Sequence, residues 1–557
     1  MRILLLCHSF NSLTQRLFVE LRERGEEVSV EFDISDDILR ESVALFAPDF
    51  IVAPFLKRTI PPDVLTQTLC LVVHPGPPGD RGPSALDWAL LGGREEWGVT
   101  LLEATGELDA GPVWAFRKFP MRAATKSSLY RHEVTRGAVQ CLFEALDLLR
   151  CGKRPAPPQR IEPMRPLCLR ADRLIDFTTD NVADALRKIR SADGSPGALA
   201  KIGGSEFLCF DAHPAPDLAG KPGELLARCG KAVAVAARDG ALWIGHLREP
   251  RVGALKLPAA FLLSARAEGL PEARRQPDVH YEQVGDVGYL YFSFHNGAMG
   301  VEDCRALEAA IVEARQAKAR ALVLMGGPDY WSNGLHLGLI EAAASAADES
   351  WRNIEAMNDC VRALLEIDDR LVVAALRGNA GAGGVFLALA ADLVLMREGV
   401  ILNPHYKDMG NLYGSEYWTY LLPRRVGAGH ARAISQGRLP IGAREAVRLK
   451  LIDEILPEDP AEAEASLHVF AQSLVASEDF ERRLDEKNAM RARDEAVKPL
   501  AAYRAEELER MRRNFWGFDP SYHVARHNFI RKVVKSRTPL HLAPHRSTRA
   551  LRRGSTS

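Results

Sequence analysis

The 557-residue sequence predicts a multidomain protein of the α/β class. Length is the first reason, because a single hydrophobic core rarely serves more than about 250–300 residues. Secondly, short apolar runs alternate with amphipathic stretches in two separate parts of the chain, residues 1–150 and 279–460. Thirdly, residues 166–265 between them contain many short β-like runs separated by Gly and Pro.

Residues 1–150 predict a mostly parallel sheet with helices on both faces. The apolar runs Ile3–Leu6 and Val28–Phe32 predict buried strands. Thr14–Arg24 predicts a helix, because its apolar residues share one face and Gly25 follows as a stop. Further strands are expected at Phe50–Pro54 and Leu69–Val73, and a further helix at Asp37–Phe46. No GxGxxG follows the first strand, so a dinucleotide site is not indicated.

Two breaks rich in Pro, Gly or charge, residues 152–160 and 268–278, predict linkers around the middle region. The region between them, residues 166–265, predicts a small β-barrel domain. After the second α/β domain, residues 461–530 predict a helical extension. Residues 531–557 contain eight Lys or Arg and no acid, which predicts a basic tail, either solvated or docked on an acidic partner.

Composition argues against several classes of protein. The formal net charge of -1 gives no reason to expect a nucleic acid partner. The nine cysteines form no CxxC pair, so we expect no metal site, no disulfide framework and a reducing compartment. The apolar run at the N-terminus is too short for a signal peptide, and no run reaches the roughly 18 apolar residues of a membrane span. We therefore expect a cytoplasmic protein without a membrane partner.

A first candidate site follows the predicted strand Leu69–Val73. His74 begins a Pro- and Gly-rich loop at the carboxyl end of this strand, where open α/β sheets bind ligands. Asp109 lies further on in the Gly-bounded loop Leu108–Gly111. An imidazole held by a carboxylate can stabilise the oxyanion of a tetrahedral intermediate and move its proton. The alternative is a structural His beside an Asp that only forms a turn.

Residues 1–150 resemble the 10-formyltetrahydrofolate-dependent formyltransferases, which imply a Rossmann-like fold. Those enzymes use Asn-x-His and a later Asp in a Leu-Asp-x-Gly setting, and His74 and Asp109 match the His and Asp. Val72 stands where the family has Asn, a change that would cost about 3 kcal/mol of oxyanion stabilisation if nothing replaced it. Residues 166–263, including Ile189–Ala198, resemble the small C-terminal β-barrel of the tRNA formyltransferase.

A second candidate site combines two loops. Trp331–Leu335 follows one predicted strand, and Gly381–Gly384 follows another and enters the apolar helix Val385–Ala391. Backbone N–H groups in such a loop and at a helix N-terminus are free to donate, and glycine admits a ligand closely. Two N–H groups from separate loops could hold a thioester oxygen that develops negative charge.

Residues 280–460 resemble the crotonase (enoyl-CoA hydratase/isomerase) superfamily. This resemblance implies that the oxyanion-hole donors are Leu335 and Gly383. The two catalytic glutamates of hydratases are replaced here by Phe386 and Tyr406. We therefore expect no hydration of an enoyl-CoA, and we predict that Tyr406 and Glu416 carry the chemistry. The alternative for Glu416 is a capping or pairing role on a surface helix.

The tandem of both domains resembles the HypX (HoxX) family of nickel–iron hydrogenase maturation proteins. The resemblance implies transfer of a formyl group from 10-formyltetrahydrofolate to the thiol of coenzyme A. Carbon monoxide would then be released from formyl-CoA as a ligand for the hydrogenase iron. It also implies small-molecule substrates and, as partners, other hydrogenase maturation proteins. Arg131 and Arg190 are predicted to hold phosphates of coenzyme A.

Three alternatives remain at this point. The second domain could hydrolyse formyl-CoA or another acyl-CoA to release formate, with Glu416 activating water. It could also be a degenerate crotonase fold that serves as a docking scaffold, in which case Glu416→Gln would leave function intact. Modification of a nucleotide sugar or tRNA by the first domain alone is disfavoured by Val72 and the near-neutral charge.

Overall fold

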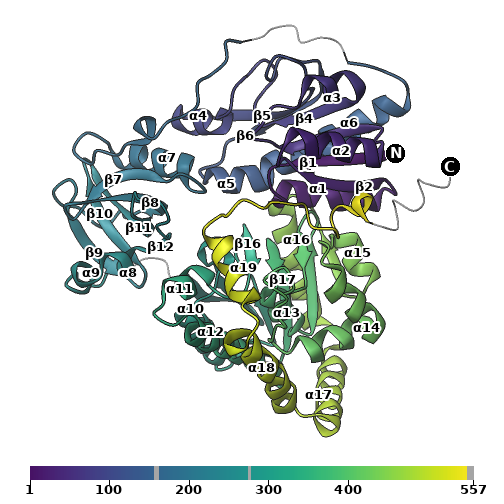
Figure 1. The fold of residues 1–557 in the computed structure, drawn as a ribbon. Coiled ribbons are helices and arrows are strands. Elements are labelled where there is room, and N and C mark those ends of the chain that lie inside the picture. Colours follow the sequence, from purple (N-terminus) through teal and green to yellow (C-terminus); the bar gives the residue numbers. More distant parts are fainter. Residues whose placement is uncertain (156–161, 274–277, 548–557) are drawn as a thin grey trace. The chain divides into compact units, whose positions relative to one another are not determined.

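The chain folds into two units in the computed structural model, which describes residues 1–155, 162–273 and 278–547. Unit 1 comprises Met1–Gln276 together with Lys535–Ser557, and unit 2 comprises Pro277–Val534. The chain therefore leaves the first unit and returns to it at its end. Figure 1 shows the elements of both units, and each unit is described by itself below.

The first sheet of unit 1 has the strand order β2-β1-β3-β4-β5-β6. Its first four strands are parallel and β5 and β6 are antiparallel additions, which confirms the predicted mostly parallel α/β domain. The strands are β1 (Arg2–Cys7), β2 (Glu27–Phe32), β3 (Phe50–Phe55), β4 (Leu69–His74), β5 (Glu96–Glu103) and β6 (Val113–Pro120). The helices are α1 (Ser12–Glu23), α2 (Asp36–Phe46), α3 (Pro62–Gln67), α4 (Ala85–Leu91), α5 (Lys126–Leu129), the π-helix η1 (Tyr130–Val134) and α6 (Thr135–Arg150).

Local sequence explains where these helices begin. The side chain of Asn11 accepts a hydrogen bond from the Thr14 N–H at the start of α1, and Ser35 accepts one from Ile38 at the start of α2. Both satisfy a backbone donor that the first turn of a helix leaves unpaired. Strand β4 is mostly apolar and ends at His74, so this imidazole lies at the carboxyl ends of the parallel strands.

The second sheet of unit 1 is antiparallel, as its short Gly- and Pro-bounded runs predict. The strands pair in the order β7-β8-β11-β10-β9, and β12 pairs with β11. Its hydrophobic core includes one face of α7, with Leu186 and Ile189. The strands are β7 (Ala198–Ile202), β8 (Ser205–Pro214), β9 (Leu225–Cys229), β10 (Ala232–Ala237), β11 (Gly240–Arg248) and β12 (Leu257–Pro258). The helices are η2 (Ala171–Arg173), α7 (Val182–Ala192), α8 (Ala259–Leu263) and α9 (Ala265–Glu268).

The end of the chain packs on the edge strand β2 of the first sheet (Figure 1). The Val30 N–H donates to the Leu542 carbonyl at 2.9 Å. Buried Glu31 accepts hydrogen bonds from Thr538, from His545 at 3.3 Å and from Arg546 at 2.6 Å. The expectation of a solvated tail is therefore wrong for residues 535–547, because a buried acid on β2 pairs with them. We call residues 535–547 the C-terminal clasp; it includes η4 (Pro544–Arg546).

Unit 2 contains a six-stranded sheet with the order β13-β14-β15-β17-β19-β21, parallel except for the β13–β14 hairpin. A smaller parallel sheet, β16-β18-β20, carries the two predicted oxyanion loops. The strands are β13 (Val279–Val284), β14 (Val287–Phe292), β15 (Ala321–Leu324), β16 (Tyr330–Ser332), β17 (Leu371–Leu376), β18 (Asn379–Gly381), β19 (Leu393–Arg397), β20 (Leu402–Asn403) and β21 (Glu454–Leu456).

The helices of unit 2 include the predicted helical extension, α16 to α19. Part of it belongs to the main core, because Leu500, Met511 and Tyr522 are buried in the same cluster as Phe386 and Tyr406. The helices are η3 (His295–Gly297), α10 (Val301–Ala314), α11 (Leu337–Ala342), α12 (Ala346–Leu365), α13 (Gly383–Leu389), α14 (Trp418–Gly437), α15 (Ala443–Arg448), α16 (Pro460–Ala476), α17 (Phe480–Val497), α18 (Leu500–Trp516) and α19 (Ser521–Ile530).

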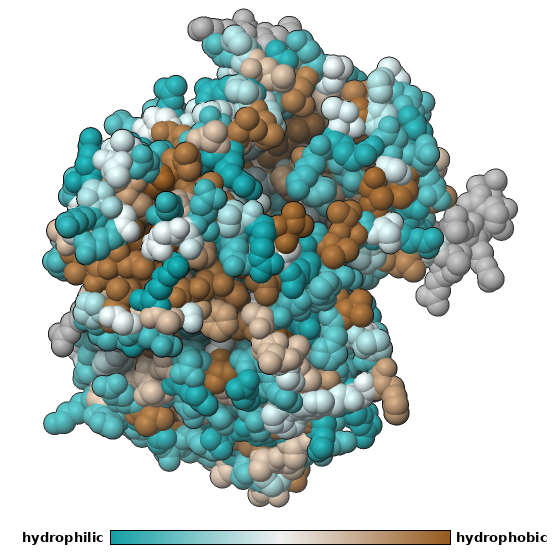
Figure 2. Space-filling view, turned by 60° about the vertical axis from the view of Figure 1, so that its left-hand side comes forward, coloured by the Kyte–Doolittle hydropathy of each residue, from teal (hydrophilic) through white to brown (hydrophobic). Residues whose placement is uncertain are grey.

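Both predicted linkers fall partly outside the described residues, which exclude 156–161 and 274–277. On the face drawn in Figure 2, patches of hydrophobic residues lie among more numerous hydrophilic ones, as on an ordinary folded surface. Among the helices that the structure describes, none is both long and apolar enough to cross a bilayer.

Two candidate active sites

The first candidate site centres on His74, which lies buried at the end of β4. Its Nδ1 lies 3.5 Å from Asp109 Oδ2, so the two residues predicted as a pair are brought together. Its Nε2 lies 3.0 Å from Asp80 Oδ2. The imidazole therefore stands between two carboxylates, one at each ring nitrogen, an arrangement that holds the ring in one orientation.

Asp80 is the residue of this site that sequence reasoning missed. It lies in the Pro- and Gly-rich loop after His74, where an Asp is expected to form a turn. Its side chain is buried, and its Oδ1 lies 3.0 Å from Nε of Arg165. The only sequence signal was an Asp within the same loop as the His, which alone does not distinguish a turn residue from a catalytic one.

Backbone contacts hold the loop that carries His74. The Thr100 hydroxyl donates to the Gly76 carbonyl at 2.7 Å, and the Trp97 indole donates to the Pro75 carbonyl at 2.8 Å. A Cβ at Gly76 would lie 2.5 Å from His74 Nε2, so the close approach of the loop to the imidazole requires glycine there. On the opposite side, the Gly82 N–H donates to Asp109 Oδ2 at 3.0 Å.

The second candidate site lies where the two loops of the smaller sheet meet. A Cβ built on Gly334 would lie 3.4 Å from the backbone nitrogen of Gly383, so the segment before Leu335 adjoins the start of α13. Across the described residues, the backbone N–H of neither Leu335 nor Gly383 donates a hydrogen bond. Two neighbouring N–H groups that are available to donate to a ligand meet the main requirement of an oxyanion hole.

Fixed contacts hold these loops in position. The Trp331 indole donates to the Gly384 carbonyl at 2.9 Å and so joins the two loops directly. The Asn333 N–H donates to the Gly297 carbonyl at 2.7 Å, and the Ala382 N–H donates to the Asn403 carbonyl at 3.0 Å. Such preorganisation matters, because donors that are already aimed need no reorganisation during the reaction.

Tyr406 and Glu416 form a hydrogen-bonded pair next to these loops. The Tyr406 hydroxyl donates to Glu416 Oε2 at 2.6 Å, and Glu416 is 1% exposed. A Cβ at Gly383 would overlap with Glu416 Oε1, so this carboxylate lies against the start of α13. The Tyr406 ring stacks on Phe386 with centroids 5.5 Å apart. Glu416 is therefore buried beside Tyr406, and the alternative of a surface pairing role does not hold.

The burial of this pair changes its acidity. Burial raises the pKa of Glu416 to about 7, although the hydrogen bond from Tyr406 opposes the rise. Burial and the neighbouring Glu416 charge raise the pKa of Tyr406 well above its ordinary value. Near neutral pH, Glu416 can therefore gain or lose a proton, whereas Tyr406 stays a hydrogen-bond donor.

The two arginines predicted to hold phosphates come from separate parts of unit 1. Arg131 lies on η1, and Arg190 lies on the last turn of α7, where burial lowers the pKa of its guanidinium. Their role as phosphate ligands stays a prediction.

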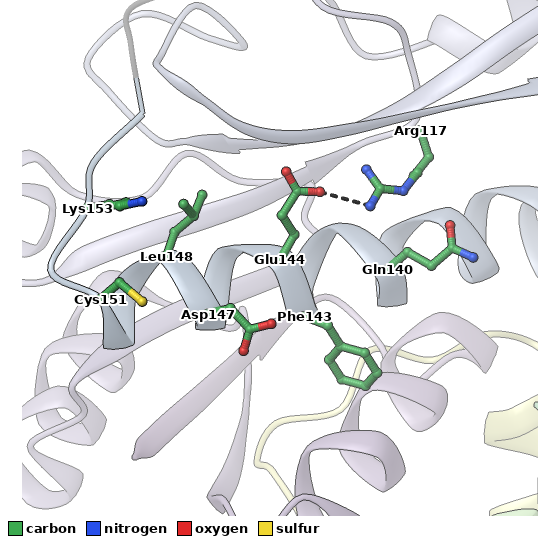
Figure 3. A pocket seen from close by; sticks show the side chains of 8 residues that line it. All are labelled: Arg117, Gln140, Phe143, Glu144, Asp147, Leu148, Cys151 and Lys153. Carbon is green, nitrogen blue, oxygen red and sulfur yellow. Dashed lines mark hydrogen bonds and ion pairs between the residues drawn. The ribbon is translucent and has the colours of Figure 1, made fainter.

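A hollow of about 490 Å³ lies elsewhere on unit 1, along α6 (Figure 3). Arg117 of β6 reaches over it to the Glu144 carboxylate at 2.8 Å, and Cys151 and Lys153 lie at its other end. None of the predicted site residues lines it. It is lined by Arg117, Gln140, Phe143, Glu144, Asp147, Leu148, Cys151 and Lys153.

Comparison with family models agrees with this division of the chain. The formyl transferase model matches residues 23–146 and the formyl transferase C-terminal domain matches residues 169–260. The enoyl-CoA hydratase/isomerase model matches residues 295–512. The chain is also 26% identical over 234 residues to methionyl-tRNA formyltransferase of Geobacter sulfurreducens, covering 41% of the chain and 73% of that protein.

Two relatives extend over nearly the whole chain. Hydrogenase maturation factor HoxX of Bradyrhizobium diazoefficiens is 58% identical over 556 residues, covering 99% of the chain and 98% of that protein. The crystal structure of HypX from Aquifex aeolicus in complex with tetrahydrofolic acid is 46% identical with a TM-score of 0.96, and the match covers 98% of this chain and 99% of that one. With its formyltransferase-like and crotonase-like parts in the same order, the chain belongs to the HoxX/HypX family of hydrogenase maturation factors.

Proposed function

We propose that this maturation factor makes carbon monoxide in two steps and supplies it as a ligand for the hydrogenase iron. In the first step, unit 1 transfers a formyl group from 10-formyltetrahydrofolate to the sulfur of coenzyme A. In the second, unit 2 splits formyl-CoA into carbon monoxide and coenzyme A. The observation that carries the proposal is the buried Tyr406–Glu416 pair beside the Leu335 and Gly383 N–H groups.

In the first step, the thiolate of coenzyme A attacks the formyl carbon and the folate nitrogen leaves. The imidazole N–H of His74, between Asp109 and Asp80, would stabilise the negative oxygen of the intermediate and give a proton to the departing nitrogen. A thiol loses its proton more readily than an amine, which suits a site where Val72 replaces an amide donor. Folate as the donor is supported by the tetrahydrofolic acid in the complex of the Aquifex aeolicus relative.

In the second step, formyl-CoA has no carbon next to its carbonyl, so enolate chemistry is not available to it. The Leu335 and Gly383 N–H groups would hold the formyl oxygen, and the Glu416 carboxylate would take the formyl proton. The electron pair of the C–H bond then forms carbon monoxide as the C–S bond breaks and the thiolate leaves. Protonated Glu416 can return the proton to this thiolate, so the step consumes no other reactant.

The surroundings of Glu416 favour release of carbon monoxide over hydrolysis. Phe386 stacks on Tyr406 and lies 6.4 Å, between ring centroids, from Trp418. A carboxylate that is 1% exposed and hydrogen-bonded to Tyr406 leaves little room for an attacking water, and hydrolysis to formate is the competing reaction.

The test separates the two steps by variant. Purified protein is given 10-formyltetrahydrofolate and coenzyme A, and carbon monoxide is measured with reduced haemoglobin while formate is measured in the same samples. His74→Ala should stop formation of formyl-CoA, whereas Glu416→Gln should let formyl-CoA accumulate without carbon monoxide. Formate in place of carbon monoxide would establish the hydrolase alternative. Full activity of Glu416→Gln would make the second domain a scaffold.

A further inference from the structure

The segment that carries Glu416 has a strained backbone. Glu416 and Tyr417 are consecutive residues in the left-handed region, with φ of 61° and 57°, just before α14 begins at Trp418. Each such residue that is not glycine costs on the order of 1 kcal/mol, so two in a row persist only where their surroundings hold them. The left-handed pair turns the chain sharply and directs the Glu416 side chain toward Gly383.

The group that holds this turn is the carboxylate of Glu507, a fully buried residue of α18. Its Oε2 accepts the Tyr417 N–H at 2.9 Å and lies 3.3 Å from the Ser415 hydroxyl, which is closer, at 3.0 Å, to Asn358 Oδ1. Its Oε1 accepts the Thr419 N–H at 2.8 Å and the Thr419 hydroxyl at 2.5 Å. The donors of Tyr417 and Thr419 follow Glu416, so this carboxylate fixes the chain after it, while Ser415 before it is shared with Asn358.

Glu507 also takes the place of a helix cap. No side chain at the start of α14 caps it, and the Thr419 N–H in its first turn would otherwise be unsatisfied inside the protein. A carboxylate at a helix N-terminus both accepts these donors and interacts favourably with the helix dipole. From the other side, Asn358 Oδ1 accepts the Glu416 N–H at 2.7 Å.

Glu507 brings a second acid close to the reactive one. The ionisable groups that act on Glu416 are Tyr406, Glu507 and, from α10, the Cys304 thiol. Burial is the main cause that raises the pKa of Glu416 to about 7, and the Glu507 charge adds to it. Burial likewise raises the pKa of Glu507 to about 7, although its hydrogen bonds oppose the rise. Removing the Glu507 charge should therefore make Glu416 a stronger acid.

We infer that Glu507 is a positioning residue of the second site, which aims the Glu416 carboxylate at the oxyanion hole and places a second acid near it. The inference rests on the proposed release of carbon monoxide from formyl-CoA. It gives the helical extension a part in the reaction, because Glu507 lies on α18. The contacts of Glu507 are with residues 415–419, so it acts on the reaction through them.

The variants Glu507→Gln and Glu507→Asp separate the two parts of this role. Both are made in the full chain and supplied with formyl-CoA, and carbon monoxide release is followed from about pH 5.5 to 8.5. Both oxygens of Glu507 accept hydrogen bonds, whereas glutamine would turn an NH2 group toward one set of donors. The loop would then shift and misplace Glu416, so kcat should fall on the order of 100-fold. Because the charge is also gone, the acid limb of the profile should move to lower pH. Aspartate keeps the charge, so kcat should fall while the limb stays in place.

Glu506→Gln is the matched control. Glu506 precedes Glu507 on α18, but it is exposed and pairs with Lys498 at the surface, so its loss should change neither kcat nor the limb. Thermal unfolding of each variant, followed by circular dichroism, shows whether unit 2 is folded, because formyl transfer reports on unit 1 alone. Unchanged kcat in Glu507→Gln, or a lower kcat with an unmoved limb, would overturn the inference.

A spectroscopic titration keeps the inference separate from the proposed function. The carboxyl band of Glu416 is isolated in infrared spectra as the difference between the wild type and Glu416→Gln, with and without Glu507→Gln. A lower titration midpoint without the Glu507 charge supports the inference even if the wild type makes no carbon monoxide, and an unmoved midpoint overturns it. The wild-type arm with formyl-CoA tests the proposed function alone.

Discussion

The Tyr406 hydroxyl donates to Glu416 Oε2 at 2.6 Å from a buried position, and it lies 3.0 Å from the Ser415 carbonyl. The Ser415 N–H also donates to Glu416 Oε2, at 3.1 Å. The acid of the predicted site is thus held by a side-chain donor and a backbone donor, which suits removal and return of a single proton.

Tyr406→Phe should slow carbon monoxide release by about 10-fold to 100-fold, because a hydrogen bond to a charged group contributes about 1.5–3 kcal/mol. The Tyr406 hydrogen bond lowers the pKa of Glu416, so its loss should move the acid limb of the profile to higher pH. The measurement is kcat against pH with formyl-CoA as substrate. Tyr413→Phe is the control, because Tyr413 is 36% exposed. An acid limb that stays in place would show that the pair does not control the proton.

Gly383→Ala should abolish carbon monoxide release while formyl transfer continues. The added methyl group would overlap with Glu416 Oε1 at the start of α13, so the carboxylate or the N–H donor must shift. A shift of about 1 Å at such a position costs on the order of 100-fold. Gly429→Ala is the matched control, since it lies exposed in α14 with nothing within 4 Å. Formyl-CoA, measured by chromatography, should accumulate. If Gly383→Ala accumulates no formyl-CoA and releases carbon monoxide at the wild-type rate, the proposed geometry is wrong.

Asp80→Asn should lower the rate of formyl transfer on the order of 100-fold, because His74 Nε2 loses the carboxylate that lies 3.0 Å from it and holds the ring in position. Release of carbon monoxide from added formyl-CoA should be unchanged, since that step belongs to unit 2. Asp63→Asn, at an exposed ion pair with Arg40, is the control. If Asp80→Asn transfers formyl groups at the wild-type rate, the second carboxylate is only structural.

The C-terminal clasp should make unit 1 sensitive to acid. Burial alone would raise the pKa of Glu31, but hydrogen bonds from His545, Ser42, Thr538 and Arg546 lower it to about 2. An acid with a lowered folded pKa stabilises the fold above its ordinary value of 4.5, and this contribution is lost as the pH falls toward 2. Urea unfolding followed at several pH values should show this loss.

Thr538→Ala isolates the same contact at neutral pH. It removes the hydrogen bonds from Thr538 to Glu31 and from the Phe32 N–H to Thr538, and should cost about 1–3 kcal/mol of unfolding free energy. Arg537→Ala, at an exposed neighbouring position, should change stability by no more than about 0.5 kcal/mol. Equal stabilities of the two variants would mean that the clasp contributes nothing.

Local patterns were enough to predict the elements that carry the sites. The apolar run before His74 and the glycines before α13 each predict a strand or helix end, and the structure has β4 and α13 there. The proximity of His74 to Asp109 could also be predicted, because both follow strands of one sheet.

Contacts that join distant segments could not be predicted from those patterns. Glu507 looks like one more acid on a charged helix, and its burial depends on packing of α18 against α12 and α14. The pairing of Glu31 with residues 535–547 joins segments about 500 residues apart. The sequence near the C-terminus shows only its basic composition, which predicts a solvated tail. The local pattern of apolar and polar residues predicts neither contact.

The most direct test of the central claim uses 10-formyltetrahydrofolate labelled with carbon-13 in its formyl group. The protein is incubated with this folate, coenzyme A and reduced haemoglobin, and the infrared C–O stretch of carbonyl-haemoglobin is recorded. We predict the frequency of labelled carbon monoxide, absent without coenzyme A and absent with His74→Ala or Glu416→Gln. Labelled formate with no labelled carbonyl band would contradict the account.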